Sequence, residues 1–236
     1  MTTEVWSQAV FLGGWFGLLH AFDADHLATI GGLALRDRSL PAMGYALRWA
    51  LGHAVALGIV ATAALGLGLA TAADWAAHGD ALVALALLAI GLQALRVAWQ
   101  WLRAARHGFL LPATAPAHVH YGARAHVHFL APWHSHAPGR TSVLMGLVHG
   151  GAGSAAVLAL LPLARFHSVL AAAVYLTCFS VGVTIGALAF ARVFALLARR
   201  SAAAGERLAA AFQTAVGLFA LVSGALLLYG MLARAS

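Results

Sequence analysis

Four ionisable side chains stand within seven residues of an otherwise apolar stretch, GLLHAFDADHLATIGG, at residues 17–32. They are His20, Asp23, Asp25 and His26. Imidazole nitrogens and carboxylate oxygens without thiolates form a ligand set that suits Ni²⁺, Co²⁺ or Zn²⁺. The residue types and their spacing therefore suggest a site for a divalent transition metal.

Two further histidines, His53 and His149, lie in other apolar runs at a similar depth. At the rise of an α-helix, His20 lies roughly 22 Å from one end of its run, and His53 and His149 lie about 18 and 13 Å from theirs. All of them then fall in the middle of a ~30 Å bilayer core, where ionisable groups mark transport pathways or ligand sites. We expect one mid-membrane metal site, made by His20, Asp25, His26, His53 and His149 with help from Asp23.

The spacing leaves one question open about the two carboxylates. On a regular helix, with about 100° between residues, His20, Asp23 and His26 share one stripe, whereas Asp25 points away from it. Either Asp25 faces another partner, or the helix loosens between Asp23 and Gly32, as the Gly31–Gly32 pair would allow. The sequence does not decide which carboxylate faces the ion.

The composition defines the elements that must position these residues. The chain has 236 residues, 62% of them hydrophobic and 9% charged, whereas a soluble domain carries about 25% charged residues. Apolar runs close to the roughly 20 residues that cross a bilayer recur along it. We expect an all-α integral membrane protein with six transmembrane helices, near residues 5–35, 41–70, 81–102, 141–163, 168–191 and 208–232.

The basic residues indicate the orientation. All fourteen are arginines, and most flank three of the connections, as Arg36, Arg38, Arg199 and Arg200 do. Because cytoplasmic loops carry excess basic residues, these connections are expected in the cytoplasm of a bacterial inner membrane, with both termini outside. The net charge of +7 is explained by this placement, so it does not indicate a nucleic-acid partner.

Short segments recur in the two halves of the chain. GLLH at 17–20 matches GLVH at 146–149, LG at 51–52 matches VG at 181–182, and IGLQAL at 90–95 matches VGLFAL at 216–221. Three spans in each half would place the halves in opposite orientations. The pattern predicts a 3+3 inverted repeat, residues 1–104 and 141–236, and such repeats hold substrate at the midplane between them.

The segment between the predicted repeats, residues 105–140, is rich in histidine. From His107 to His136 it holds seven of the thirteen histidines of the chain. Such a tract is typical of weak, multi-site binding of Ni, Co or Zn, although a linker that has drifted or a pH-sensitive loop would also account for it. The expected auxiliary ligands are the three H-x-H pairs, His118, His120, His126, His128, His134 and His136.

The same motifs resemble the nickel/cobalt transporter superfamily. HAFDADHL at 20–27 resembles its H-x4-D-H signature, LGHAVALG at 51–58 its LGH segment, and GLVHGGAGSAA at 146–156 the urease-accessory-type branch. The resemblance implies that His20, Asp25 and His26 are essential for nickel, with Asp23 and His53 in support. Typical members have eight spans and an LGxDTATE-type motif, whereas this chain has six expected spans and His149 at the corresponding place.

The expected function is therefore that of a permease for Ni²⁺ or Co²⁺, with uptake favoured and no permanently bound cofactor. An exporter of the same superfamily and a membrane-anchored nickel-binding accessory protein for urease or hydrogenase maturation remain alternatives. The expected partners are the metal ion, the lipid bilayer, nickel-enzyme maturation factors and a second copy of the chain. An enzyme is not expected, because the chain has no H-E-x-x-H motif and no phosphate-binding glycine loop.

Overall fold

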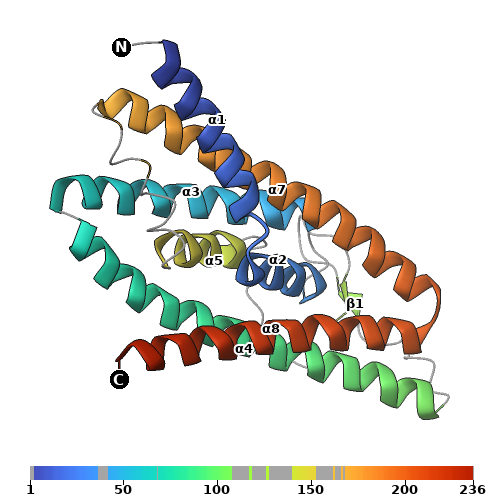
Figure 1. Ribbon diagram of the computed structural model, residues 1–236. Coiled ribbons are helices and arrows are strands. Elements are labelled where there is room, and N and C mark those ends of the chain that lie inside the picture. Colours follow the sequence, from blue (N-terminus) through green and yellow to red (C-terminus); the bar gives the residue numbers. More distant parts are fainter. Residues whose placement is uncertain are drawn as a thin grey trace.

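The computed structural model describes residues 3–36, 42–67, 69–107, 117–118, 126–127, 140–152, 162, 166 and 168–235. Helices account for nearly all of this part of the chain (Figure 1). They are α1 (Thr3–His20), α2 (Ala24–Arg36), α3 (Ala42–Leu67), α4 (Leu69–His107), α5 (Arg140–Gly151), α7 (Val169–Ala203) and α8 (Glu206–Ala235). Two short strands, β1 (Ala117–His118) and β2 (His126–Val127), pair in antiparallel fashion.

The long helices surround two short ones (Figure 1). α4 packs along α8, α1 packs along α7, and α3 packs against both α5 and α7. The short helix α2 contacts α3, α4, α7 and α8, while α5 lies against α3 and α4. The short helices are therefore held in the middle of the fold, where their polar residues meet those of the long helices.

Four helices among the described residues are long and apolar enough to span a membrane: Ala42–Ala63, His78–Gln100, Val169–Ala203 and Arg207–Ala233. They coincide with four of the six apolar runs. Their outer faces carry exposed aliphatic side chains, such as Leu51, Val55 and Ile59 on α3. Such surfaces are suited to lipid, which makes an all-helical membrane protein the consistent description.

The other two apolar runs are not continuous helices. The run expected at 5–35 is interrupted after His20 and resumes at Ala24. In the run expected at 141–163, α5 ends at Gly151, and most of the remaining residues of that run lie outside the described part of the chain. The span expected at 5–35 is thus interrupted at the polar cluster, at the start of the stretch from Asp23 to Gly32 where a loosened helix was one of the two expectations.

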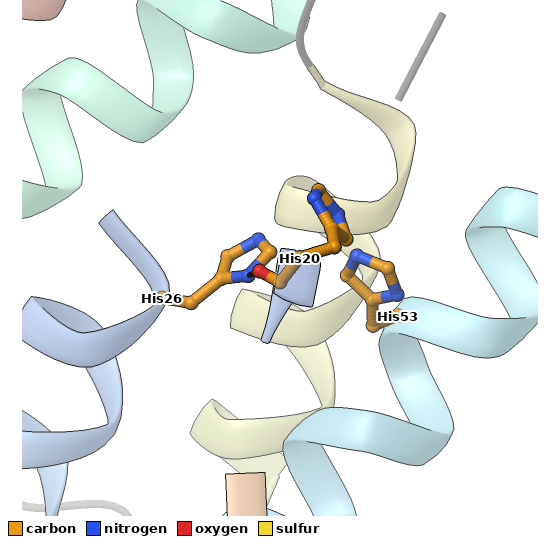
Figure 2. Close-up of side chains that lie close together, drawn as sticks. All are labelled: His20, His26 and His53. Carbon is orange, nitrogen blue, oxygen red and sulfur yellow. Dashed lines mark hydrogen bonds between the residues drawn. The ribbon is translucent and has the colours of Figure 1, made fainter. Parts of the chain in front are cut away.

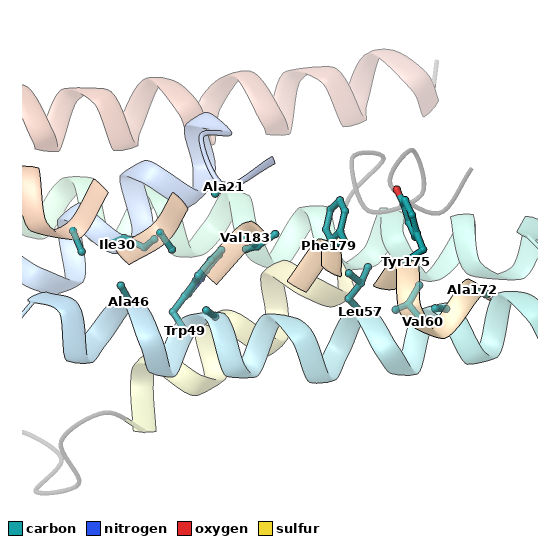
Figure 3. Close-up of a cluster of buried hydrophobic side chains, with 14 of the residues drawn as sticks. Ala21, Ile30, Ala46, Trp49, Leu57, Val60, Ala172, Tyr175, Phe179 and Val183 are labelled. Carbon is teal, nitrogen blue, oxygen red and sulfur yellow. The ribbon is translucent and has the colours of Figure 1, made fainter. Parts of the chain in front are cut away.

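The largest buried cluster lies where α3 and α7 face each other (Figure 3). Trp49, Tyr175 and Phe179 are fully buried there and fill the space between small residues. Many of the small residues are alanines, including Ala46, Ala172 and others on the same helices. The alanines let the helix axes approach closely, and the aromatic rings occupy the remaining volume.

Two close helix contacts depend on glycine. A Cβ atom on Gly17 of α1 would collide with the carbonyl oxygen of Phe179 on α7, and one on Gly146 of α5 would collide with that of Trp49 on α3. Gly146 is 129 positions after Gly17, and Phe179 is 130 positions after Trp49. The α1–α7 and α3–α5 contacts therefore use corresponding residues.

The same correspondence recurs where α4 meets α8. A Cβ atom on Gly91 would meet the Gly217 carbonyl and Leu221, and one on Gly217 would meet the Gly91 carbonyl and Leu95. Gly217 is 126 positions after Gly91, and Leu221 is the same number after Leu95. Each helix thus contributes the same pair of residues, a glycine and the leucine four positions later, to the contact.

Candidate metal centre

The site is organised by the break between α1 and α2. The amides of Phe22 and Asp23 bond to the carbonyls of Leu19 and His20, three residues back, which tightens the end of α1. The carbonyl of Asp23 then accepts the first bond of α2, from Leu27. Asp23 thus occupies the N-cap position of α2, where Asp is among the preferred residues.

His26 completes the end of α1. Its Nδ1 donates to the carbonyl of His20, at 2.9 Å, and this carbonyl also accepts the amide of Asp23, so the ring occupies its second acceptor site. Because a carbonyl can only accept, Nδ1 carries the hydrogen, and the neutral ring keeps its lone pair on Nε2. The ring is almost fully buried. His26 is therefore held in the tautomer that offers Nε2 to a metal ion.

Asp23 orients His20 in a similar way. Nδ1 of His20 lies 2.8 Å from Oδ2 of Asp23, so the ring donates to the carboxylate and presents Nε2 in its neutral form. A carboxylate behind a histidine is the usual arrangement that fixes a metal-ligating ring and raises its basicity. Asp23 therefore acts on the site through His20.

His53 contributes a buried imidazole without hydrogen bonds. Its side chain is 1% exposed, and neither Nδ1 nor Nε2 has a hydrogen-bond partner among the described residues. A buried polar group is normally bonded, because leaving it unbonded costs free energy. An incoming metal ion would supply the partner that this ring lacks.

The three imidazoles form one ligand set (Figure 2). One ligand atom from each of His20, His26 and His53 lies within 4.8 Å of the others, and the ring centroids are 4.6, 5.4 and 5.3 Å apart. An ion bonded to two imidazoles at about 2.0–2.1 Å holds the centroids roughly 4.5–5.2 Å apart. Small ring rotations would therefore suffice to close the set around an ion.

Both carboxylates lie beside this set. Asp23, Asp25 and His26 can also bring one ligand atom each within 4.8 Å of one another. Oδ2 of Asp25 is 4.0 Å from Nε2 of His26, the nitrogen that carries the lone pair. Asp25 therefore lies beside His26, while Asp23 is bonded to His20.

His149 stands next to the set and is bonded on both nitrogens. Its Nδ1 donates to the Met145 carbonyl at 2.8 Å, and its Nε2 lies 3.0 Å from Oγ1 of Thr29. Its ring centroid is 5.6 Å from that of His26. Of the six predicted site residues, five contribute to the two groups of neighbouring ligand atoms, and His149 lies beside them.

Some features of the site were not anticipated from the sequence. Trp49 packs against the rings of His26, His53 and His149, at centroid distances of 4.7, 5.1 and 5.9 Å, so it forms an apolar wall of the site. The helix loosens at residues 21–23, ahead of Gly31 and Gly32, which instead pack against Phe194 and Ile90. The only sequence signal for the break is Asp23, an N-cap residue type within an apolar run.

Of the six histidines expected as auxiliary ligands, two lie in the described part of the chain, on β1 and β2. The strand pairing places His118 directly opposite His126 in the β1–β2 ladder. His120, His128, His134 and His136 lie outside the described residues. The expectation that these six histidines bind metal thus stays a prediction.

Comparisons with known proteins give no match: no protein-family model, no curated protein and no solved structure resembles the chain closely enough to be assigned. The functional argument therefore depends on the geometry of the site and on the residues that carry it.

Proposed function

We propose that the chain is a secondary transporter of Ni²⁺ or Co²⁺, and that the ion passes through the site made by His20, His26 and His53. The observation that carries this proposal is the hydrogen bonding of the three rings. Two are fixed with Nε2 free to bind an ion, by Asp23 and by the His20 carbonyl, and the third is buried without a partner among the described residues. The ring nitrogens of a buried histidine with a purely structural role normally form hydrogen bonds to other protein groups.

The break in the helix favours transport over static binding. Backbone that leaves a regular helix at membrane depth is tolerated where it lines a cavity or a site, and interrupted helices carry the substrate sites of many secondary transporters. Here the break between α1 and α2 supplies both His20 and His26. The motif resemblance to nickel/cobalt transporters supports the same metals.

The architecture that we propose is six spans arranged as a 3+3 inverted repeat. The broken pair α1–α2 counts as one span, and α5 with the residues after it counts as another. The support is the reciprocity of the glycine contacts, in which Gly17 on Phe179 corresponds to Gly146 on Trp49. In Figure 1 both termini lie to the left, whereas the end of α4 and the α7–α8 turn lie to the right. That placement agrees with outside termini and cytoplasmic arginine-rich connections.

Uptake is the favoured direction. A divalent cation that moves inward gains about 4.6 kcal/mol at 100 mV, negative inside, since each charge contributes about 2.3 kcal/mol. We place the protein in a bacterial inner membrane and propose that the histidine-rich loop, on the cytoplasmic side, receives the ions that enter. No resident cofactor is part of this mechanism, because the metal is the cargo.

The test is flux of radioactive nickel into sealed vesicles that contain the purified protein. We expect His20→Ala to abolish the flux and deletion of residues 113–138 to leave it. His78→Ala is the matched control, because it removes an exposed histidine outside the ligand set. Absence of flux from folded protein, in both directions and with or without a proton gradient, would contradict the transporter and leave a metal-binding accessory protein.

A further inference from the structure

The hydrogen bond between Thr29 and His149 joins the two halves of the chain beside the ligand set. Thr29 lies on α2, three residues after the ligand His26 and on the same face of the helix. His149 lies on α5. Both side chains are buried, with exposed fractions of 0% and 2%, so water does not compete for this bond.

The direction of the bond is set by the other nitrogen of His149. Nδ1 of His149 is 2.8 Å from the Met145 carbonyl and must donate to it. In the neutral ring Nε2 then carries the lone pair, and Thr29 Oγ1 donates its hydrogen to Nε2 at 3.0 Å. His149 is therefore in the same tautomer as His20 and His26, but a hydroxyl covers the atom that would bind metal.

His149 lies beside the ligand set but outside it, because neither group of described ligand atoms within 4.8 Å of one another includes it. Its centroid is 5.6 Å from that of His26, against 5.4 Å for the widest pair within the set. The helix that carries it is pressed against α3 at His53, since a Cβ atom on Gly150 would collide with the His53 carbonyl. The helices that carry His149 and His53 are thus in direct contact beside the site.

We propose that His149 is an exchangeable fourth imidazole ligand and that Thr29 is the positioning residue that competes with the ion for its Nε2. This inference rests on the proposed metal site. When Thr29 holds His149, the ion has three imidazoles and leaves readily. When His149 moves to the ion, binding tightens and α2 is released from α5, which links occupancy of the site to a contact between the two halves.

The test is a double-mutant cycle on the full chain in detergent, with Co²⁺ as the probe and calorimetric titration as the measurement. Thr29→Val removes the hydroxyl with little change in shape, and Thr29→Ser keeps it. Because a competing hydrogen bond has a modest net free energy, Thr29→Val is expected to raise Co²⁺ affinity roughly three- to tenfold. It should also slow release to a chelator, whereas Thr29→Ser should behave as the wild type.

His149 must be required for that gain. In the His149→Phe background, which keeps a ring in the same space, Thr29→Val should leave the affinity unchanged. An unchanged or weaker affinity for folded Thr29→Val, or a gain that persists in His149→Phe, would overturn the proposal. If the valine variant does not fold, Thr29→Ala makes the same prediction. Wild-type protein that binds no Co²⁺ would instead contradict the metal site itself.

Discussion

At the scale of single residues, the proposed role of His53 makes a prediction about stability. Its ring is buried with both nitrogens unbonded among the described residues, and an unsatisfied buried polar group costs about 1–3 kcal/mol. His53→Leu replaces that ring with an apolar side chain. We expect the metal-free variant to unfold at the same temperature as the wild type or a higher one, while the stabilisation by added Ni²⁺ disappears. Thermal unfolding in detergent, with and without Ni²⁺, measures both effects.

His26 is the matched comparison for this experiment. It is buried like His53, but its Nδ1 donates a hydrogen bond to the His20 carbonyl at the end of α1. His26→Leu should therefore lower the unfolding temperature of the metal-free protein as well as remove the response to Ni²⁺. If both leucine variants destabilised the metal-free protein equally, His53 would have a structural partner and the argument for a vacant ligand would fail.

Asp23 should matter through the oxygen that it offers to His20. Asp23→Ala removes the acceptor from Nδ1 of His20, and loss of such a supporting group typically lowers metal affinity roughly 10–100-fold. Asp23→Asn keeps an oxygen that can accept the same hydrogen bond, so most of the affinity should remain. Calorimetric titration with Ni²⁺ compares the two variants. Equal losses would show that the negative charge, and not the orientation of His20, is what Asp23 supplies.

At the scale of elements, the site depends on how closely α5 and α3 approach. Gly146→Ala would place a methyl group against the Trp49 carbonyl and push α5 away from the helix that carries His53. We expect lower thermal stability and weaker Ni²⁺ binding. The corresponding substitution on the other helix pair, Gly17→Ala, should act in the same direction because it displaces the end of α1 that carries His20.

Open glycines on the same helices provide the controls. A Cβ atom on Gly58 of α3 or Gly14 of α1 meets no other described atom within 4 Å. Alanine at these positions should leave Ni²⁺ binding unchanged and stabilise the helix by about 0.5–1 kcal/mol. A loss of binding in Gly58→Ala as large as that in Gly146→Ala would contradict the role assigned to close packing.

The sequence predicts some of these elements better than others. Long apolar runs identify α3, α4, α7 and α8, because length and composition suffice for a helix in lipid. The break after His20 contains neither glycine nor proline, so periodicity alone continues the helix through it. At the break, the His20 carbonyl accepts not only the Asp23 amide but also the His26 ring, six residues further on. Helix periodicity and residue propensities do not predict a bond from a side chain to this carbonyl.

The site shows the same division between local and tertiary information. The depth argument predicts that His20, His26, His53 and His149 lie at one level, because helices of known rise bring residues of equal depth together; the first three form one group, and His149 lies beside it. The role of each residue cannot be read from depth. Whether a histidine binds an ion, as His53 is placed to do, or is covered, as His149 is by Thr29, depends on side chains from other helices.

At the scale of the whole molecule, the two halves correspond in packing but differ in chemistry. His149 is 129 positions after His20, and its ring meets Trp49 as that of His20 meets Phe179. The counterpart of His53, 130 positions on, is Val183. Among the described residues, the first half therefore places three imidazoles together, and His149 of the second half lies beside them. In the proposed mechanism, an ion held by His20, His26 and His53 would gain His149 as its ligand from the second half.

The proposed orientation can be tested on the same scale. Three spans per half place both termini on one side of the membrane and the loop between the halves on the other. With Cys178→Ala as the background, Ser236→Cys and Ala115→Cys each introduce a single thiol. In intact cells, a membrane-impermeant maleimide should label Ser236→Cys, and it should label Ala115→Cys only after permeabilisation. Both variants must first transport nickel like the wild type, which shows that the fold is retained. Labelling of both thiols in intact cells would require an even number of crossings between residues 115 and 236, which three spans in the second half cannot provide, and would contradict the inverted repeat.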